Sequence, residues 1–272
     1  MFEMWEKFLG DRKYWLEIIS LMWILVYENL DSTDSSSPKF LMISPLWKAF
    51  HSRIRDLPQM QKYLNSSSYR KYLLHFRKVD FVDKRYARGD GEWQKDKFNL
   101  GLDFPNLPYY MDGEVKLSQT FAILRCLAGK YGLDGKTDQQ RLRVFLAEQQ
   151  SADFRNNLRT VAVSNDYEKL KDDFIKTLPD AFSLWNKFLG NRKYLAGDDV
   201  TYVDFMVFEN LDFYRLFHPS IIDEFPTLKD YHNRMRNLPE LQGYFNSSTY
   251  RRWPIFAPHF KFGGSGEPPK HL

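Results

Sequence analysis

The run from Asn99 to Leu124, NLGLDFPNLPYYMDGEVKLSQTFAIL, constrains the fold most, because it places a proline turn, a hairpin and a helix start in direct succession. Two short apolar runs, Tyr109 to Met111 and Val115 to Leu117, are joined through Asp112-Gly113, a dipeptide that favours tight hairpin turns. This stretch therefore predicts a short hairpin that leads directly into a helix.

The helix start after the hairpin is a candidate ligand site. Ser118, Gln119 and Thr120 precede apolar residues with helical spacing, and such an end directs unpaired N–H groups outward, where a carboxylate binds favourably. Gln119 and Thr120 could equally serve only as helix caps. Before the hairpin, Leu107-Pro108 predicts a cis peptide in a tight turn, which would turn the Leu107 backbone outward as a pairing edge.

The motif KFNLGLDFPNLPYYMDG, followed by LSQTFAILR, resembles the core of the cytosolic glutathione transferases, most closely that of the mu class. In that family the backbone before the cis-proline pairs with the cysteinyl unit of glutathione, and a Gln-Ser or Gln-Thr pair binds the γ-glutamyl carboxylate. The resemblance implies glutathione as co-substrate, small apolar electrophiles as its acceptors, and no metal. The glutathione-binding residues that it implies are Trp93, Lys97, Asn106, Leu107, Gln119, Thr120 and Asp153, with Pro108 at the turn.

The resemblance also implies a homodimer. Asp153, in AEQQSAD, matches an acidic residue that reaches across the dimer to the glutathione amine, and Phe104 matches an aromatic that inserts into the partner subunit. Asp153 could also be a plain solvated acid on a helix. Val163 stands where mu-class enzymes carry a second tyrosine beside the electrophile, so activation of the electrophile there is not expected.

An internal repeat gives this chain a different domain organisation from that of an ordinary member of the family. WEKFLGDRKY, YENLD and NSSSYRK near the N-terminus match WNKFLGNRKY, FENLD and NSSTYRR near the C-terminus, and the copies keep register to within one residue. Thr201 and Asp204 predict a capping box in the second copy, whereas the first copy has no such pair. Residues 1–75 are therefore interpreted as a degenerate helical copy of the C-terminal domain.

The region that follows departs from the family pattern. Val79 to Tyr86 resembles the second strand of a thioredoxin-like domain, but the first strand and the thiol-activating tyrosine have no counterpart. Residues Tyr72 to Arg77 could form a substitute strand, while Tyr69 and Tyr72 are better explained as core or surface packing than as thiol activators. The loop before Trp93 is short, so the family's arginine contact is not expected there.

From Lys136 the chain predicts helices. Leu142, Phe145 and Leu146 are expected to continue with Phe154 and Leu158 as one apolar face. The fold expected overall is α/β plus all-α and mostly helical. Its parts are a degenerate helical copy at 1–75, a truncated thioredoxin-like glutathione-binding domain at 76–130, an all-α domain at 136–256 and a flexible tail at 257–272.

Composition limits the class of protein. The 39 basic and 35 acidic residues are mixed along the chain, so no nucleic-acid footprint is present. The single cysteine, Cys126, excludes an intrachain disulfide and fits a small core residue in a reducing compartment. No apolar run is long enough to span a membrane. The sequence therefore predicts a cytoplasmic protein that contacts neither nucleic acid nor membrane.

Three functions remain open from the sequence. The first is a detoxifying glutathione S-transferase whose activity is impaired by the missing tyrosine. The second is a noncatalytic remnant that dimerises or binds ligand, and the third is a fusion product that does not fold stably.

Overall fold

The computed structural model describes residues 69–86, 91–264 and 267–271, all of them within one compact unit, Arg55–Leu272. The predicted helical copy therefore lies, as far as residue 68, outside the described residues. The elements in chain order are α4 (Tyr69–Phe76), α5 (Glu92–Asp96), β1 (Tyr109–Asp112), β2 (Val115–Ser118), α6 (Thr120–Tyr131), α7 (Asp138–Val163), α8 (Tyr167–Leu189), α9 (Tyr202–Phe217), η3 (Ile221–Glu224), α10 (Pro226–Arg236) and α11 (Pro239–Phe245).

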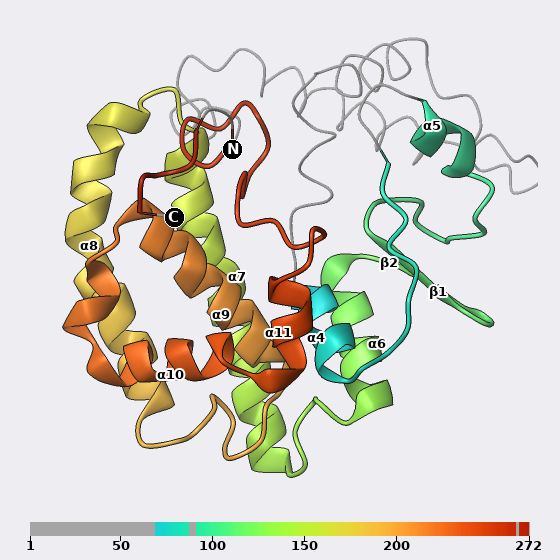
Figure 1. Cartoon of the computed structure of the whole chain (residues 1–272), viewed down its shortest axis with the longest axis horizontal. Coiled ribbons are helices and arrows are strands. Elements are labelled where there is room, and N and C mark those ends of the chain that lie inside the picture. The colour runs from blue at the N-terminus through green and yellow to red at the C-terminus, as the bar shows by residue number, and fades with distance from the viewer. Residues whose placement is uncertain (1–68, 87–90, 265–266, 272) are drawn as a thin grey trace, which may run out of the picture. The chain divides into compact units, whose positions relative to one another are not determined.

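Helix α9 lies at the centre of the helical part, where it contacts α7, α4 and α10 (Figure 1). It begins where the sequence predicts a cap: the N–H and the hydroxyl of Thr201 both donate to one Asp204 carboxylate oxygen at 2.8 Å. The other oxygen of Asp204 accepts from the Leu195 N–H at 2.9 Å and the Tyr231 hydroxyl at 3.0 Å. Because all these donors are buried, this acid fixes the helix start and the loop before it.

The apolar face of α7 differs from the predicted one. Phe154 and Leu158 are buried as expected, but Leu142, Phe145 and Leu146 are 66%, 52% and 61% exposed. The buried positions of α7 follow a stripe of mostly small side chains instead: Val144, Ala147, Glu148, Ser151, Phe154, Leu158 and Ala162. Helix α9 carries large aromatic residues toward this contact, so small residues let the two helices approach.

The predicted hairpin is confirmed, with its turn one residue later than expected. Strands β1 and β2 pair antiparallel, with Tyr109 opposite Ser118 and Asp112 opposite Val115. Asp112 therefore belongs to the ladder, and the two turn residues are Gly113 and Glu114. Gly113 has φ +57°, the conformation that a two-residue hairpin requires at its first turn position.

Two strands predicted within the described residues before the hairpin are not present in the structure. Residues 72–76 lie in helix α4, which buries Tyr72, Leu73 and Leu74 against α9, α11 and α6, so the substitute strand is wrong. Residues 79–86 form no strand, and Val82 is 92% exposed. Within the described part of the chain the sheet has only β1 and β2, and a segment without a neighbouring strand cannot satisfy its backbone as a strand.

The segment expected to be a flexible tail is packed in its first half. Ala257 and Phe260 are buried, and the Lys261 N–H donates to the Ala162 carbonyl at 2.7 Å. This hydrogen bond ties the segment to the C-terminal end of α7. Among the described helices, none is both long and apolar enough to cross a membrane.

Candidate functional site

The Leu107–Pro108 peptide is cis, as predicted, and leads directly into β1. Leu107 is buried, and its backbone N–H donates to the Asn106 side-chain oxygen at 2.9 Å. The donor of the predicted pairing edge is therefore already bonded within the turn. A ligand group that accepts from the Leu107 N–H replaces the Asn106 side-chain oxygen, which is then available for other contacts.

Helix α6 begins at Thr120, as predicted, but without a side-chain cap. Its N-cap residue, Gln119, has φ +69° and ψ +118°, a backbone conformation that non-glycine residues rarely adopt. The Gln119 side chain is exposed. Next to it, the buried Ser118 hydroxyl donates to the Phe104 carbonyl at 2.6 Å and ties the helix start to the loop before the cis-proline. The simple capping role of Gln119 is therefore not observed.

Arg70 reaches the same helix start from α4. Its Nη1 donates to the Thr120 hydroxyl oxygen at 3.3 Å. Burial lowers the pKa of the Arg70 guanidinium, because a desolvated cation is less stable than a hydrated one. Sequence reasoning missed Arg70, since it lies in the repeated NSSSYRK segment and not in the motif that resembles the glutathione-binding core. Only the packing of α4 on α6 brings it to Thr120.

Trp93 lies in α5 and Lys97 caps its C-terminal end, so both precede the Leu107–Pro108 turn in the chain. The Trp93 ring stacks on Tyr109 at 6.2 Å and meets the Tyr86 ring edge-on at 5.3 Å. The Tyr86 hydroxyl donates to Asp96 at 2.9 Å and lies 3.1 Å from the Tyr109 hydroxyl, and burial, followed by these two hydrogen bonds, raises the pKa of Tyr86. The ring of Trp93 is thus held by β1, while Lys97 makes no ion pair with a described residue.

Asp153 and Phe104 both face solvent. Asp153 is exposed on α7, and no hydrogen bond or ion pair joins it to the other predicted site residues within the described chain. Phe104 is 73% exposed, although its carbonyl is held by Ser118. The structure thus joins Phe104 to Ser118, which precedes Gln119 and Thr120, and leaves Asp153 apart.

Two tyrosines close to the site in sequence are core residues, as predicted. Tyr69 and Tyr72 are 6% and 2% exposed. Tyr72 packs its ring against Phe205 and Phe208 of α9. Across residues 69–86, 91–264 and 267–271, no group of three or more His, Cys, Asp or Glu side chains is placed to hold a metal ion.

Comparison with known proteins agrees with this arrangement. Residues 152–248 match the family model "Glutathione S-transferase, C-terminal domain". The chain is 44% identical over 192 residues to glutathione S-transferase Mu 1 of Oryctolagus cuniculus, an alignment that covers 68% of this chain and 88% of the relative. It is 42% identical over 192 residues to the class-mu 26 kDa isozyme 1 of Fasciola hepatica, with 70% and 87% covered.

The fold is similar to those of solved structures from the same family. The crystal structure of the glutathione S-transferase Blo t 8 superposes with a TM-score of 0.67 at 32% sequence identity, and the match covers 72% of this chain and 94% of that one. The pi-class glutathione S-transferase of Onchocerca volvulus matches with a TM-score of 0.64 at 28% identity, with 73% and 95% covered.

Proposed function

Because the chain belongs to the glutathione S-transferase family, within which it resembles the mu class, we propose that it binds glutathione and transfers the thiol to small apolar electrophiles, with reduced activity. The observation that carries the proposal is the unbroken sequence of cis Leu107–Pro108, hairpin and uncapped α6 start. We infer that residues 76–130 are a truncated thioredoxin-like domain and that residues 136–256 form the all-α domain beside it.

The γ-glutamyl carboxylate would bind at the start of α6. The free N–H groups of the first helical turn carry partial positive charge, and Gln119 and Thr120 supply further donors. Arg70, 3.3 Å from the Thr120 hydroxyl, adds a formal positive charge on the same side. A bound anion stabilises the charged form of a desolvated guanidinium. Anion binding therefore stabilises the Arg70 cation, and the Arg70 cation strengthens anion binding.

The other two units of glutathione would follow the turn toward α5. The cysteinyl backbone would pair with Leu107, displacing the Asn106 oxygen from its N–H, and the Asn106 amide would then face the ligand. The glycyl carboxylate would meet the Lys97 ammonium and the Trp93 indole N–H. The stack of Trp93 on Tyr109 supports this placement, because it fixes the indole against the strand that follows the cis-proline.

The thiol would be poorly activated. A free thiol with a pKa of about 8.5 is only about 3% thiolate at pH 7, and the thiolate is the nucleophile. Tyr69 and Tyr72 are buried in the core, and the Tyr109 hydroxyl is engaged with Tyr86, so none of these three is available to donate to the sulfur. Loss of one preorganised donor reduces the chemical step by about 10²–10³, which is the reduction we expect.

A homodimer would complete the site. Phe104 and the α7 residues Leu142, Phe145 and Leu146 are each more than half exposed, and apolar side chains of this size are favourably buried by a partner. Asp153 on the same helix would reach the glutathione amine of the partner subunit. Its exposure and its lack of a described ion pair leave the carboxylate available for that contact.

Thermal melting of the full chain with and without millimolar glutathione tests the proposal. A ligand that binds only the folded state raises stability by RT ln(1 + [L]/Kd), so the melting temperature should rise. Gln119→Ala and Lys97→Ala should each reduce the rise, while Gln139→Ala, an exposed glutamine in the first turn of α7, should leave it unchanged. The absence of any rise in the unmodified protein would contradict glutathione binding.

The noncatalytic alternative has an observation of its own in its favour, the burial of Tyr69 and Tyr72. A conjugation assay with 1-chloro-2,4-dinitrobenzene separates the two functions. If glutathione raises the melting temperature and dinitrophenyl-glutathione still forms no faster than without protein, the chain is a glutathione-binding protein without transferase activity.

A further inference from the structure

A cavity of about 160 Å³ lies between the C-terminal half of α9 and the segment around residues 250–255. None of the residues proposed above for glutathione lines it. An apolar cavity of about 150 Å³ is large enough to hold one benzene ring. The cavity is therefore wide enough for a ligand with a single ring. The charge and polarity of its lining decide which class of ligand it prefers.

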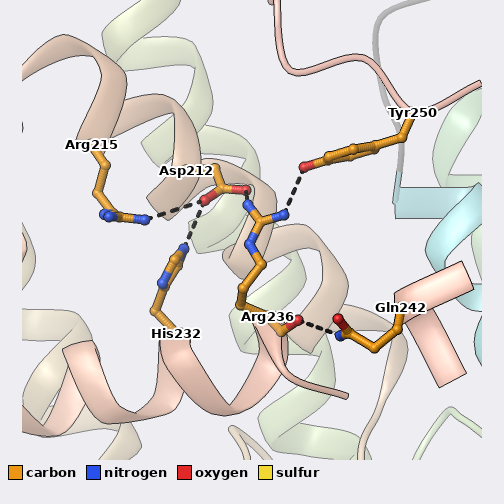
Figure 2. A network of polar contacts seen from close by, with 6 residues as sticks. All are labelled: Asp212, Arg215, His232, Arg236, Gln242 and Tyr250. Atoms are coloured by element: carbon orange, nitrogen blue, oxygen red, sulfur yellow. Dashed lines mark hydrogen bonds and ion pairs between the residues drawn. The ribbon is translucent and has the colours of Figure 1, made fainter. Parts of the chain in front are cut away.

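The acidic residues of its lining are already neutralised by arginines that lie outside the lining. Glu209 is paired with Arg155 at 2.5 Å. Asp212 accepts from Arg236 at 2.5 Å and from His232 at 2.7 Å, as Figure 2 shows. Both carboxylates thus contribute little net negative charge to the cavity.

Three arginines line the cavity: Arg215, Arg251 and Arg252. Arg215 approaches Asp212 from the side opposite Arg236, and its Nη1 stays 3.8 Å from the nearest carboxylate oxygen (Figure 2). Arg251 makes no hydrogen bond or ion pair with any described residue, and it is exposed. The charged groups around the cavity therefore have a surplus of guanidinium over carboxylate, which favours an anion.

Apart from Arg252 and His271, the rest of the lining is apolar or aromatic. Phe213, Leu216 and Ile255 of the lining are buried, with 7%, 8% and 4% exposure. Tyr250 also lines the cavity, and its hydroxyl accepts from Arg236 at 2.9 Å. A lining that combines buried apolar side chains with guanidinium groups is complementary to a ligand that is flat and apolar at one end and anionic at the other.

We propose that this cavity binds a small aromatic carboxylate of the size of benzoate. The ring lies against Phe213, Leu216 and Ile255, and the carboxylate accepts hydrogen bonds from Arg215 and Arg251. The site is separate from the glutathione site and does not depend on transferase activity.

Calorimetric titration of the full chain with benzoate, and with benzamide as its neutral isostere, tests the proposal. Benzoate should bind at least about tenfold more tightly, because a charge-assisted hydrogen bond contributes about 1.5 kcal/mol or more. Arg251→Gln and Arg215→Gln should each weaken benzoate by about tenfold and leave benzamide unchanged. Arg141→Gln is the matched control, since this half-buried arginine lies on α7 and pairs with Asp138.

Two results would overturn the proposal. One is equal binding of benzoate and benzamide, or benzoate binding that neither Arg251→Gln nor Arg215→Gln weakens. The other is loss of benzoate binding at saturating glutathione, which would place the carboxylate in the proposed glutathione site. Unchanged benzoate affinity in the presence of glutathione is the expected result. Because Arg251 is exposed, its replacement should leave the thermal melt unchanged, which checks that the variant is folded.

Discussion

Helix α9 and the β1–β2 hairpin differ in how deeply they are buried and in which contacts fix their position. Fourteen of the 16 residues of α9 are buried, including Asp204, Glu209 and Asn210, and each of these three polar side chains has a hydrogen-bond or ion-pair partner. Among the eight strand residues of the hairpin only Ser118 is buried. The helix is fixed by its own packing, whereas the hairpin is fixed by a few contacts at its ends.

The difference separates stability from ligand binding. A two-stranded hairpin is marginally stable alone, and this one depends on the Ser118 bond to Phe104 and on the ion pair between Asp112 and Lys130 of α6. Apart from Asp153 on α7, the proposed glutathione residues lie around this less buried region. Substitutions in α9 should therefore change stability strongly, and substitutions around the hairpin should change binding with little effect on stability.

The strongest test of this comparison is Phe208→Ala in α9. Phe208 is fully buried, so its truncation should lower the free energy of unfolding by about 3–5 kcal/mol through the cavity it leaves. Phe98→Ala is the matched change near the hairpin and should alter stability by less than about 0.5 kcal/mol, because that ring is 75% exposed. Urea unfolding of both variants gives the two values, and similar losses would remove the distinction between the regions.

Asp212→Asn tests the charged cluster that Asp212 of α9 forms with His232 and Arg236 of α10. Burial alone would raise the pKa of Asp212, but the hydrogen bond from His232 and the charges of His232 and Arg236 outweigh it, so the pKa is lowered. Removing the charge leaves these partners uncompensated and should lower the free energy of unfolding by about 3 kcal/mol at pH 7.

The loss at Asp212 should depend on pH. A lowered folded-state pKa means that the carboxylate contributes stability above its ordinary pKa of about 3.9, and that this contribution is lost as the pH falls through the folded value. The difference in the free energy of unfolding between the parent and Asp212→Asn should thus be constant from pH 7 to about pH 5. It should become smaller as the pH falls below about 4. Urea unfolding across this range measures it, and a difference that persists in full at pH 3 would refute the assignment.

Gln119→Gly should separate binding from stability at the hairpin side. Glycine adopts φ +69° without the steric cost that glutamine bears, so the free energy of unfolding should rise by about 1 kcal/mol. The rise in melting temperature produced by glutathione should fall at the same time. Gln139→Gly, in the regular helix α7, should instead destabilise by about 1 kcal/mol. A stabilised variant with an unchanged response to glutathione would exclude Gln119 from the binding site.

Phe104→Ala should have the smallest effect on stability, because the ring is 73% exposed. We expect a change within about 0.5 kcal/mol in the dilute protein. Its effect should appear in the molecular mass measured by light scattering, as a shift from dimer toward monomer. A variant that stays dimeric at the concentrations where the parent does would show that this side chain lies outside the dimer contact.

The sequence by itself determined the elements that depend on local chemistry. The hairpin, the cis Leu107–Pro108 peptide, the start of α6 at Thr120 and the Thr201–Asp204 cap were all predictable, because turn residues, proline and capping residues act within a few positions of the chain. The turn was still misplaced by one residue, since Asp112 can either end a strand or begin a turn.

Only the tertiary structure decided which faces are buried and which distant groups meet. The α7 stripe faces α9 through small residues that periodicity underestimates, and α4 forms a helix because α9, α11 and α6 offer it an apolar surface while no strand is there to pair. Arg70 at Thr120, and Arg215 and Arg251 at the cavity, likewise have no local signal. Contacts of this kind join residues far apart in sequence, so they are fixed by packing rather than by neighbouring residues.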